Sequence, residues 1–329
     1  MAKSMLGFDI GTSELKIAQW DGHEVTQTLH ATMPDNMVKN GVIVSYEAMA
    51  DFIKETVRGN RLKGSSCAVI LPSSFTFLRR ITMPAMTVDQ LAINLPYEFR
   101  DFLDMGKDKY FYDYSVVEII KDESGKPVQM ELVAAAIAKS IIEDYRDMFR
   151  RAGLKLVTAV PAECAYANLI ERKGGEEKQE YAILNIGHTV TRIDIYTGSR
   201  FEVSHIGEIG LDEVDQMISD GLNVDTHVAR TYKQSNHQDV LNAEGCREVY
   251  RGIATDVRKA VNFYGFNNRE SNLHDVWCCG GGAFIPALVE TVGEATDLTV
   301  HPIEELLPPL GSGATDAALF VAAIGAAIQ

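Results

Sequence analysis

The sequence predicts an α/β fold of two lobes, in which the second lobe duplicates the first and the first carries a small inserted subdomain. Three observations support this prediction. A hairpin pattern near the N-terminus recurs in the second half of the chain, alternating strand and helix patterns follow each copy, and extra material lies between the copies. With 329 residues, 46% of them apolar, the chain can bury one large core or two smaller ones.

The duplication appears when the chain is aligned with itself. Residues 5–11 (MLGFDIG) match residues 181–187 (YAILNIG), and the same register places Lys16 on Arg192 without a gap. Each copy reads as strand, glycine turn, strand, turn, with an apolar run that ends in Asp or Asn. The alternative is a chance match between two ordinary β-hairpins.

The lobe boundary is expected at a polar, glycine-bearing link, Arg172–Lys178. This division gives a first lobe over residues 1–178 and a second lobe over residues 179–315. A closing helix over residues 316–329 is expected to pack back on the first lobe. Within the first lobe, residues 47–58 read as a helix.

The inserted subdomain is expected at about residues 79–150. It combines a helical stretch over residues 88–103 with a hairpin of two strands, residues 110–117 and 130–138, around a charged turn. In the second lobe, residues 211–257 are expected to form a small helical subdomain that begins with a helix over Leu211–Leu222.

The net charge of -15, from 31 Lys and Arg against 46 Asp and Glu, opposes contact with nucleic acid or anionic lipid. No apolar core of a signal peptide follows Met1, and no stretch approaches the ~20 apolar residues of a membrane span. We therefore expect a cytoplasmic protein without direct membrane insertion and without a nucleic-acid partner.

The first candidate binding element is the turn after the N-terminal strand. Gly11 lets the backbone approach a ligand, and Thr12 and Ser13 present amides and hydroxyls to phosphate oxygens. Asp9 would hold Mg²⁺ through water, and Lys16 would add positive charge near the phosphates. A plain structural turn is the alternative for any single motif of this kind.

The second candidate element is the matching turn, with Asn185, Gly187, His188 and Thr189. Two hairpin turns that face each other across a cleft can clamp one phosphate chain. This pairing makes the two turns more specific together than either is alone.

The third candidate element is the glycine run Gly280, Gly281 and Gly282, which joins a strand to a helix. Without side chains, the backbone can lie flat against a base or ribose. A flexible strand-to-helix connection is the alternative. The helix that follows has an apolar face, which favours the binding role.

Together these three elements resemble the phosphate and adenosine motifs of the superfamily of actin, heat-shock chaperones and sugar kinases. The resemblance implies an actin-like fold with ribonuclease H-like lobes, and ATP or ADP with Mg²⁺ in the cleft. Residues 229–233 (ARTYK) are similar to the Ala-Glu-x-x-Lys segment near adenosine in that superfamily, so Lys233 is a candidate ligand. Arg230 replaces the acid of that segment.

Within the superfamily the chain resembles the PilM family of type IV pilus assembly proteins. The resemblance rests on residues 69–74 (VILPSS), residues 81–84 (ITMP), residues 112–114 (YDY) and the C-terminal run 321–328. It implies a cytoplasmic ATP-binding assembly protein, peripheral to the inner membrane. This protein would dock on the cytoplasmic N-terminal peptide of an inner-membrane PilN-like partner.

Two departures from the superfamily pattern bear on hydrolysis. Asn185 stands where the second phosphate motif has Asp, so it adds no negative charge for Mg²⁺ or water activation. The acid before proline in the interlobe helix falls on Pro161, and Glu163 comes two residues late. We expect nucleotide binding with slow or absent hydrolysis, and assign no catalytic residue.

Two alternative functions stay open. A small-molecule kinase would need a carboxylate base for its acceptor hydroxyl, and no motif places one in the cleft. The FtsA cell-division family ends in an amphipathic membrane-targeting helix, whereas we expect the sequence here to end with the closing helix. The oligomeric state, including a homo-oligomer, also stays open.

Overall fold

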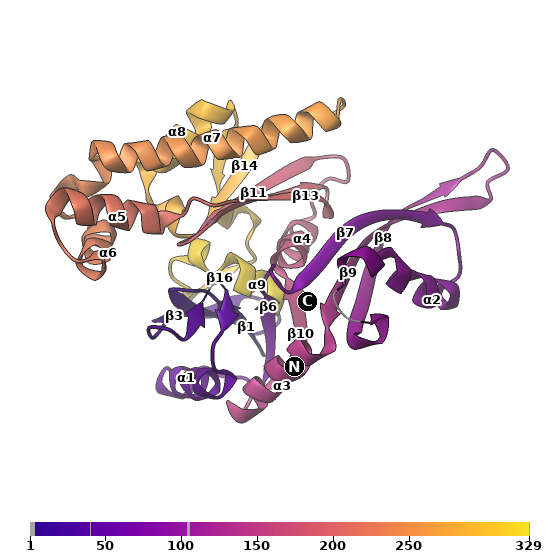
Figure 1. Ribbon diagram of the computed structural model, residues 1–329, viewed down its shortest axis with the longest axis horizontal. Helices are drawn as coiled ribbons and strands as arrows, with labels where there is room; N and C mark the ends of the chain where they lie inside the picture. Colours follow the sequence, from indigo (N-terminus) through magenta and orange to yellow (C-terminus); the bar gives the residue numbers. More distant parts are fainter. Residues whose placement is uncertain (1–3, 40, 104–105, 329) are drawn as a thin grey trace.

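The computed structural model describes residues 4–39, 41–103 and 106–328, which form two α/β lobes and a smaller inserted layer (Figure 1). Residues 1–3 and 329, at the ends of the predicted first lobe and closing helix, lie outside the described residues. The first sheet contains, in spatial order, β10 (Lys155–Pro161), β6 (Ser66–Leu71), β1 (Met5–Ile10), β2 (Glu14–Trp20), β3 (Val25–Thr32) and β16 (Leu310–Gly313). The second contains β13 (Arg200–Gly207), β12 (Thr191–Thr197), β11 (Glu180–Ile186), β14 (Asp275–Cys279) and β15 (Thr299–Pro302).

The two sheets repeat one topology. In each, three consecutive strands form an antiparallel meander (β1 to β3, β11 to β13), and two later strands extend the sheet in parallel (β6 and β10, β14 and β15). Met5 pairs with Trp20 in the first hairpin, and Tyr181 pairs with Tyr196 in the second. This is the register that the aligned copies predict. The predicted α/β fold of two duplicated lobes is confirmed.

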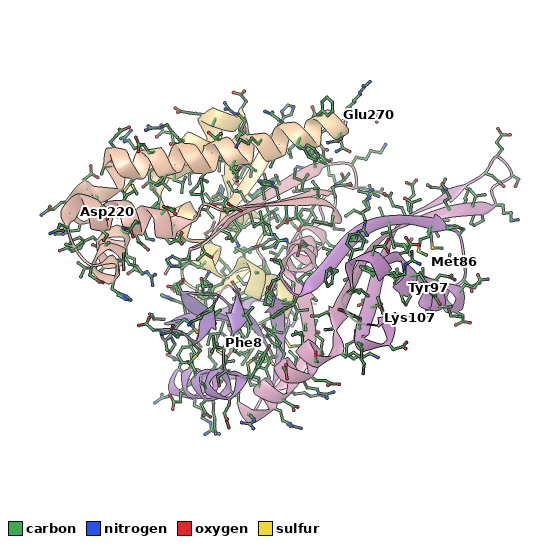
Figure 2. All side chains as sticks on the ribbon, in the orientation of Figure 1. Phe8, Met86, Tyr97, Lys107, Asp220 and Glu270 are labelled. Atoms are coloured by element: carbon green, nitrogen blue, oxygen red, sulfur yellow. The ribbon has the colours of Figure 1, made fainter. Side chains whose placement is uncertain are left out.

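The helices cover both faces of each sheet. Their bounds are α1 (Tyr46–Gly59), α2 (Val88–Glu98), α3 (Lys139–Arg151), α4 (Ala162–Lys173), α5 (Leu211–Leu222), α6 (Thr226–Ser235), α7 (Glu244–Asn267), α8 (Pro286–Thr296) and α9 (Val321–Ala327). Helices α1 and α3 cover the outer face of the first sheet, where Phe8 (labelled in Figure 2) meets Phe149 with ring centroids 5.0 Å apart. Helices α5, α7 and α8 cover the outer face of the second sheet.

Helices α4 and α9 lie between the two sheets and join the lobes in one core. Alternate residues of β11 show this clearly, because Ile183 faces the interlobe core while Leu184 faces α5 and α7. Gly7 lets α9 lie directly on β1, since a Cβ at Gly7 would sit 1.9 Å from the carbonyl oxygen of Ala323. The lobes therefore share buried apolar surface as well as a chain connection.

The C-terminal segment returns to the first lobe. Strand β16 pairs in parallel with β3. The hydroxyl of Thr28 donates to the carbonyl oxygen of Thr315 at 2.7 Å and accepts from the Thr315 N–H at 2.9 Å. Residues 310–313, which the sequence division counts with the second lobe, thus form an edge strand of the first sheet.

The insert is a sheet of β7 (Thr76–Pro84), β9 (Pro127–Ala138) and β8 (Tyr110–Lys121), with α2 on one face. Leu91 and Leu95 of α2 pack against Met83, Leu132 and Ala134. The hairpin of β8 and β9 projects from the body of the molecule (Figure 1). Helix α3, which the sequence division counts with the insert, packs instead on α1 and β10 of the first lobe.

Two short strands, β4 (Val38–Lys39) and β5 (Val42–Ile43), complete the regular elements. The longest helix, α7, is amphipathic, with its apolar side in the core of the second lobe. In the part of the chain that the structure describes, no helix combines the length and the apolar character needed to cross a membrane.

Candidate functional site

A cavity of about 560 Å³ lies between the lobes. This volume is within the usual range of small-molecule sites. The first lobe contributes β2, β3 and the turn before β2, and the second contributes the turn between β11 and β12, helix α6 and the η4 turn (Gly281–Phe284). The cavity therefore depends on both lobes.

Residues of all three predicted elements, and the predicted lysine of α6, line this cavity. The predicted residues on its wall are Ser13, Lys16, Gly187, His188, Lys233 and Gly281. The remaining predicted residues lie outside the lining: Asp9, Gly11, Thr12, Asn185, Thr189, Gly280 and Gly282. The three elements thus converge, but about half of the predicted residues support the wall rather than form it.

The first turn is held by backbone hydrogen bonds. The Gly11 N–H donates to the carbonyl oxygen of Glu14 at 3.0 Å, and the Met33 N–H donates to that of Ser13 at 2.9 Å. Lys16 pairs with Asp9 across the β1–β2 hairpin, and its Nζ lies 4.0 Å from Asp9 Oδ2. Lys16 thereby reaches the cavity with its carboxylate partner directly behind it.

The second turn repeats this geometry and is anchored on α5. The Gly187 N–H donates to the carbonyl oxygen of Val190 at 3.0 Å, the equivalent of the bond in the first turn. The N–H groups of Leu211 and Asp212 donate to the carbonyl oxygens of Gly187 and His188 at 3.1 and 2.8 Å. The first turn of α5 therefore holds the loop that carries His188.

A charged cluster forms the second-lobe wall of the cavity. The buried carboxylate of Asp215 lies 2.7 Å from Lys233 Nζ and 3.6 Å from Arg230 Nε. Lys233 also donates to the carbonyl oxygen of Leu211 at 3.0 Å. Burial lowers the pKa of Lys233, and the nearby Asp215 opposes that shift. Lys233 is thus the inner, carboxylate-paired cation of this wall.

His188 belongs to the same cluster. Its Nε2 lies 2.9 Å from Arg230 Nη2, and its Nδ1 lies 3.9 Å from Asp215 Oδ2. Burial, followed by the charges of Arg230 and Lys233, lowers the pKa of His188. At neutral pH the imidazole is therefore uncharged and can accept a hydrogen bond from Arg230.

The glycine-rich turn presses against β11. Gly280 has φ of +80°, and a Cβ there would lie 2.4 Å from Asn185 Oδ1. Asn185 donates from Nδ2 to the hydroxyl of Tyr166 on α4 at 2.9 Å. Of the three glycines, only Gly281 faces the cavity, beside an apolar wall that includes Phe284. That wall can pack against a planar base.

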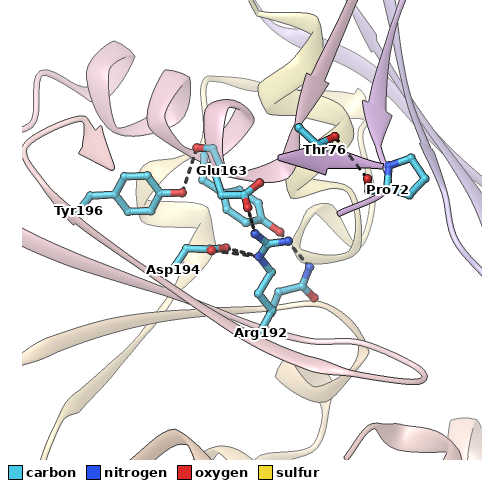
Figure 3. Close-up of polar contacts among 8 residues, drawn as sticks. Pro72, Thr76, Glu163, Arg192, Asp194 and Tyr196 are labelled. Atoms are coloured by element: carbon cyan, nitrogen blue, oxygen red, sulfur yellow. Dashed lines mark hydrogen bonds and ion pairs between the residues drawn. The ribbon is translucent and has the colours of Figure 1, made fainter. Parts of the chain in front are cut away.

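A buried ionic network joins the lobes behind the cavity. Figure 3 shows Arg192 of β12 between Asp194 on the same strand and Glu163 of α4. The Tyr196 hydroxyl donates to the backbone carbonyl of Glu163 at 2.9 Å. Burial raises the pKa of Asp194 to about 6, and Arg192 opposes the rise. Glu163 is held by Arg192 and does not line the cavity, in line with its place two residues after the position of the superfamily's acid.

Sequence reasoning missed several lining residues. His30 is opposite Lys16 in the β2–β3 register, so a prediction of strand pairing would have found it. Asp316 reaches the cavity wall from the C-terminal segment that returns to the first lobe, and no local sequence pattern predicts this position. Glu14, the other acidic residue of the wall, lies 3.3 Å from His30 Nδ1. The sequence pattern marks Arg230 only as a replacement for the acid of the Ala-Glu-x-x-Lys segment, and does not predict that it lines the cavity.

The donor set fits a magnesium nucleotide. Lys16 and Arg230 supply cations for a phosphate chain, and Lys233 and the apolar wall suit the adenosine end. Mg²⁺ keeps several waters and takes one or two carboxylates, a need that Asp9, or Glu14 on the wall, can meet. Within the described residues, no group of three or more His, Cys, Asp and Glu forms a metal cage.

The same fold occurs in solved structures of other proteins. MreB 5 of Spiroplasma citri bound to AMPPNP has a TM-score of 0.54 at 13% identity, covering 99% of this chain and 95% of that one. The ethanolamine utilization protein EutJ from Carboxydothermus hydrogenoformans has a TM-score of 0.62 at 17% identity, covering 99% and 89%. The chain is therefore a two-lobed protein of the actin-like ATPase fold.

Two further comparisons are more specific. A structure described as a PilM-PilN type IV pilus biogenesis complex has a TM-score of 0.83 at 18% identity, covering 100% of this chain and 99% of that one. The family model for the type IV pilus assembly protein PilM matches residues 7–307. The chain therefore belongs to the PilM family of type IV pilus assembly proteins, as its resemblance predicts. It matches none of the curated proteins with which it was compared.

Proposed function

We propose that this chain binds ATP or ADP with Mg²⁺ between its lobes and docks on the cytoplasmic N-terminal peptide of an inner-membrane PilN-like protein. The observation that carries the nucleotide part is the cavity itself. It gathers Lys16, Arg230 and Lys233 in a chain of net charge -15, next to two matched turns. Cationic side chains at these positions can pair with the oxygens of a compact polyanion.

Every predicted binding residue except Asn185 has a role toward the nucleotide in this proposal. The turn of Gly11, Thr12 and Ser13 and the turn of Gly187, His188 and Thr189 would present amides and hydroxyls to the phosphates. Asp9 would hold Mg²⁺ through water, and Lys16 would offset phosphate charge. Lys233 and the turn of Gly280, Gly281 and Gly282 would serve the adenosine end.

Hydrolysis is expected to be slow or absent. Asn185 is engaged with Tyr166 and adds no negative charge for activating water. Glu163 is ion-paired with Arg192 away from the cavity wall. The nucleotide would then act chiefly by holding the lobes in one arrangement.

Calorimetric titration tests the nucleotide proposal. ATP with Mg²⁺ should bind to the wild-type chain, and Lys16→Ala should weaken binding about tenfold or more, because it removes a charge-assisted contact. Lys259→Ala, at an exposed position of α7, is the matched control and should leave the affinity for ATP unchanged. No binding heat and no thermal shift with millimolar ATP would refute the proposal.

The partner would dock on the insert. Helix α2 buries Leu91 and Leu95 but leaves Val88, Ile93 and Tyr97 exposed, with Tyr97 labelled on the outer side of the insert in Figure 2. A peptide that is disordered when free needs such apolar anchors to offset its ordering cost. Docking would hold the chain at the cytoplasmic face of the inner membrane without a lipid anchor.

A peptide titration with surface variants tests this part. Ile93→Asp should weaken binding of the N-terminal peptide of the PilN-like partner, because it places a charge on the apolar face of α2. Phe266→Asp makes the same kind of change at an exposed site on α7 of the second lobe and should have no effect. Equal affinities for both variants and the wild type would exclude α2 as the docking face.

A further inference from the structure

Helix α6 places two cations on the cavity wall, Arg230 and Lys233. They differ in exposure and in their distance from Asp215. The side chain of Lys233 is 11% exposed, and its Nζ contacts both Asp215 and the carbonyl oxygen of Leu211. The side chain of Arg230 is 34% exposed and lies farther from Asp215, at 3.6 Å. Asp215 therefore pairs more closely with Lys233 than with Arg230, and Arg230 is the more exposed cation of the cavity wall.

The polar atoms of Arg230 are only partly satisfied. Nη2 lies 2.9 Å from His188 Nε2, and the buried Nε finds no hydrogen-bond partner among the described residues. That Nε faces the buried Asp215 carboxylate at 3.6 Å, so an anion in the cavity would meet the outer part of the guanidinium.

His188 determines where the guanidinium lies. The imidazole belongs to the turn between β11 and β12, which α5 anchors through the Leu211 and Asp212 N–H groups. A neutral imidazole with its proton on Nδ1, facing Asp215, presents Nε2 as an acceptor to Arg230. Arg230 is therefore tied to one of the two turns that would hold the phosphates, although it belongs to another element.

We propose that Arg230, positioned by His188, is a specificity-determining residue that recognises the charge of the phosphate chain. The inference rests on the proposed nucleotide function and adds to it. The arginine that stands in place of an acid in α6 makes the site favour ATP and ADP over AMP and adenosine. A planar guanidinium can contact phosphate oxygens in a bidentate way, which a lysine cannot reproduce.

Calorimetry with ATP, ADP, AMP and adenosine, each with Mg²⁺, tests the inference. Arg230→Gln should lower the ratio of ATP affinity to adenosine affinity about tenfold or more, through loss of a charge-assisted contact. Arg230→Lys should lower this ratio by a smaller factor, since lysine keeps the positive charge but cannot form the bidentate contact. Thr231→Ala, at the next and exposed position of α6, is the matched control and should keep the wild-type ratio.

The outcomes separate this inference from the proposed function. If the wild-type chain binds no ATP, both are wrong. If it binds ATP and Arg230→Gln weakens ATP and adenosine equally, Arg230 only supports the fold, and this inference alone is overturned. Should Arg230→Gln fail to fold, His188→Ala tests the positioning role, because it removes the Nε2 acceptor and leaves Asp215 in place. An unchanged ATP-to-adenosine ratio in His188→Ala would contradict that role.

Discussion

Arg80 of β7 forms an ion pair with Glu202 of β13, and the same guanidinium donates from Nη2 to Glu131 Oε2 on β9 at 3.0 Å. The insert belongs to the first lobe by chain connection, yet its Arg80 also forms an ion pair with the second lobe. A change in the angle between the lobes would have to stretch or break this contact. The Arg80–Glu202 pair therefore offers a physical route from the cleft to the insert.

The first prediction concerns this coupling. If nucleotide changes the affinity for the partner peptide, Glu202→Gln should reduce that change toward zero, because the charged contact between insert and second lobe is lost. Typical coupling free energies of about 1–3 kcal/mol correspond to roughly 5–150-fold in affinity. Peptide titrations with and without ATP measure the effect of nucleotide on peptide affinity. Glu208→Gln, on an exposed loop, serves as control, and an undiminished nucleotide effect in Glu202→Gln would exclude this route.

The second prediction concerns the contact between α9 and β1. Gly7→Ala should destabilise the protein by about 1–3 kcal/mol or more, because the added Cβ would collide with the backbone of Ala323. Gly59→Ala in α1 is the matched control, since a Cβ there meets open space and alanine favours helix by up to about 1 kcal/mol. Urea unfolding compares the two. Equal stabilities would show that α9 can shift away from β1 at little cost.

The third prediction concerns pH. The pKa of His188 is lowered in the folded state by burial, Arg230 and Lys233, against the opposing charges of Asp212 and Asp215. Below about pH 6.5, the unfolded chain then binds the proton more readily than the folded chain, so stability falls as the pH drops. His188→Gln should flatten this fall.

Urea unfolding at pH 7.5 and 5.5 measures the difference between the wild type and His188→Gln. Asp194, with its pKa raised to about 6, contributes with the opposite sign. That contribution is present in both proteins and cancels in the comparison. Parallel losses of stability on acidification would mean that His188 is not the responsible group.

The fourth prediction concerns the interlobe network. Arg192→Ala should cost about 3–5 kcal/mol, because it leaves the buried carboxylates of Asp194 and Glu163 without their cation. Adding Asp194→Asn and Glu163→Gln should recover part of this loss, since the unpaired charges are removed. Denaturant unfolding measures both variants. A loss below about 1 kcal/mol for Arg192→Ala would place the network among weak surface pairs.

Local pattern was enough to predict the repeated hairpins, their glycine turns and most helices. The turn at Gly11 and the turn at Gly187 each follow a short apolar run, and a glycine at that point permits a tight turn into the next strand. Helix α5 begins and ends where its sequence period predicts, at Leu211 and Leu222. Lys16, Gly187 and Lys233 consequently reach the predicted cleft. Their roles toward a nucleotide stay predictions.

The tertiary structure decided the remaining features, because they depend on burial between distant segments. Strand β16 joins β3, and Thr28 meets Thr315, only because α9 must bury its apolar surface against β1 and α4. Asp316 reaches the cavity wall for the same reason. The pairing of Arg230 with His188 arises because α5 and α6 fold over the second turn. Sequence periodicity reports which face of an element is apolar, and only the packed chain determines which partner covers it.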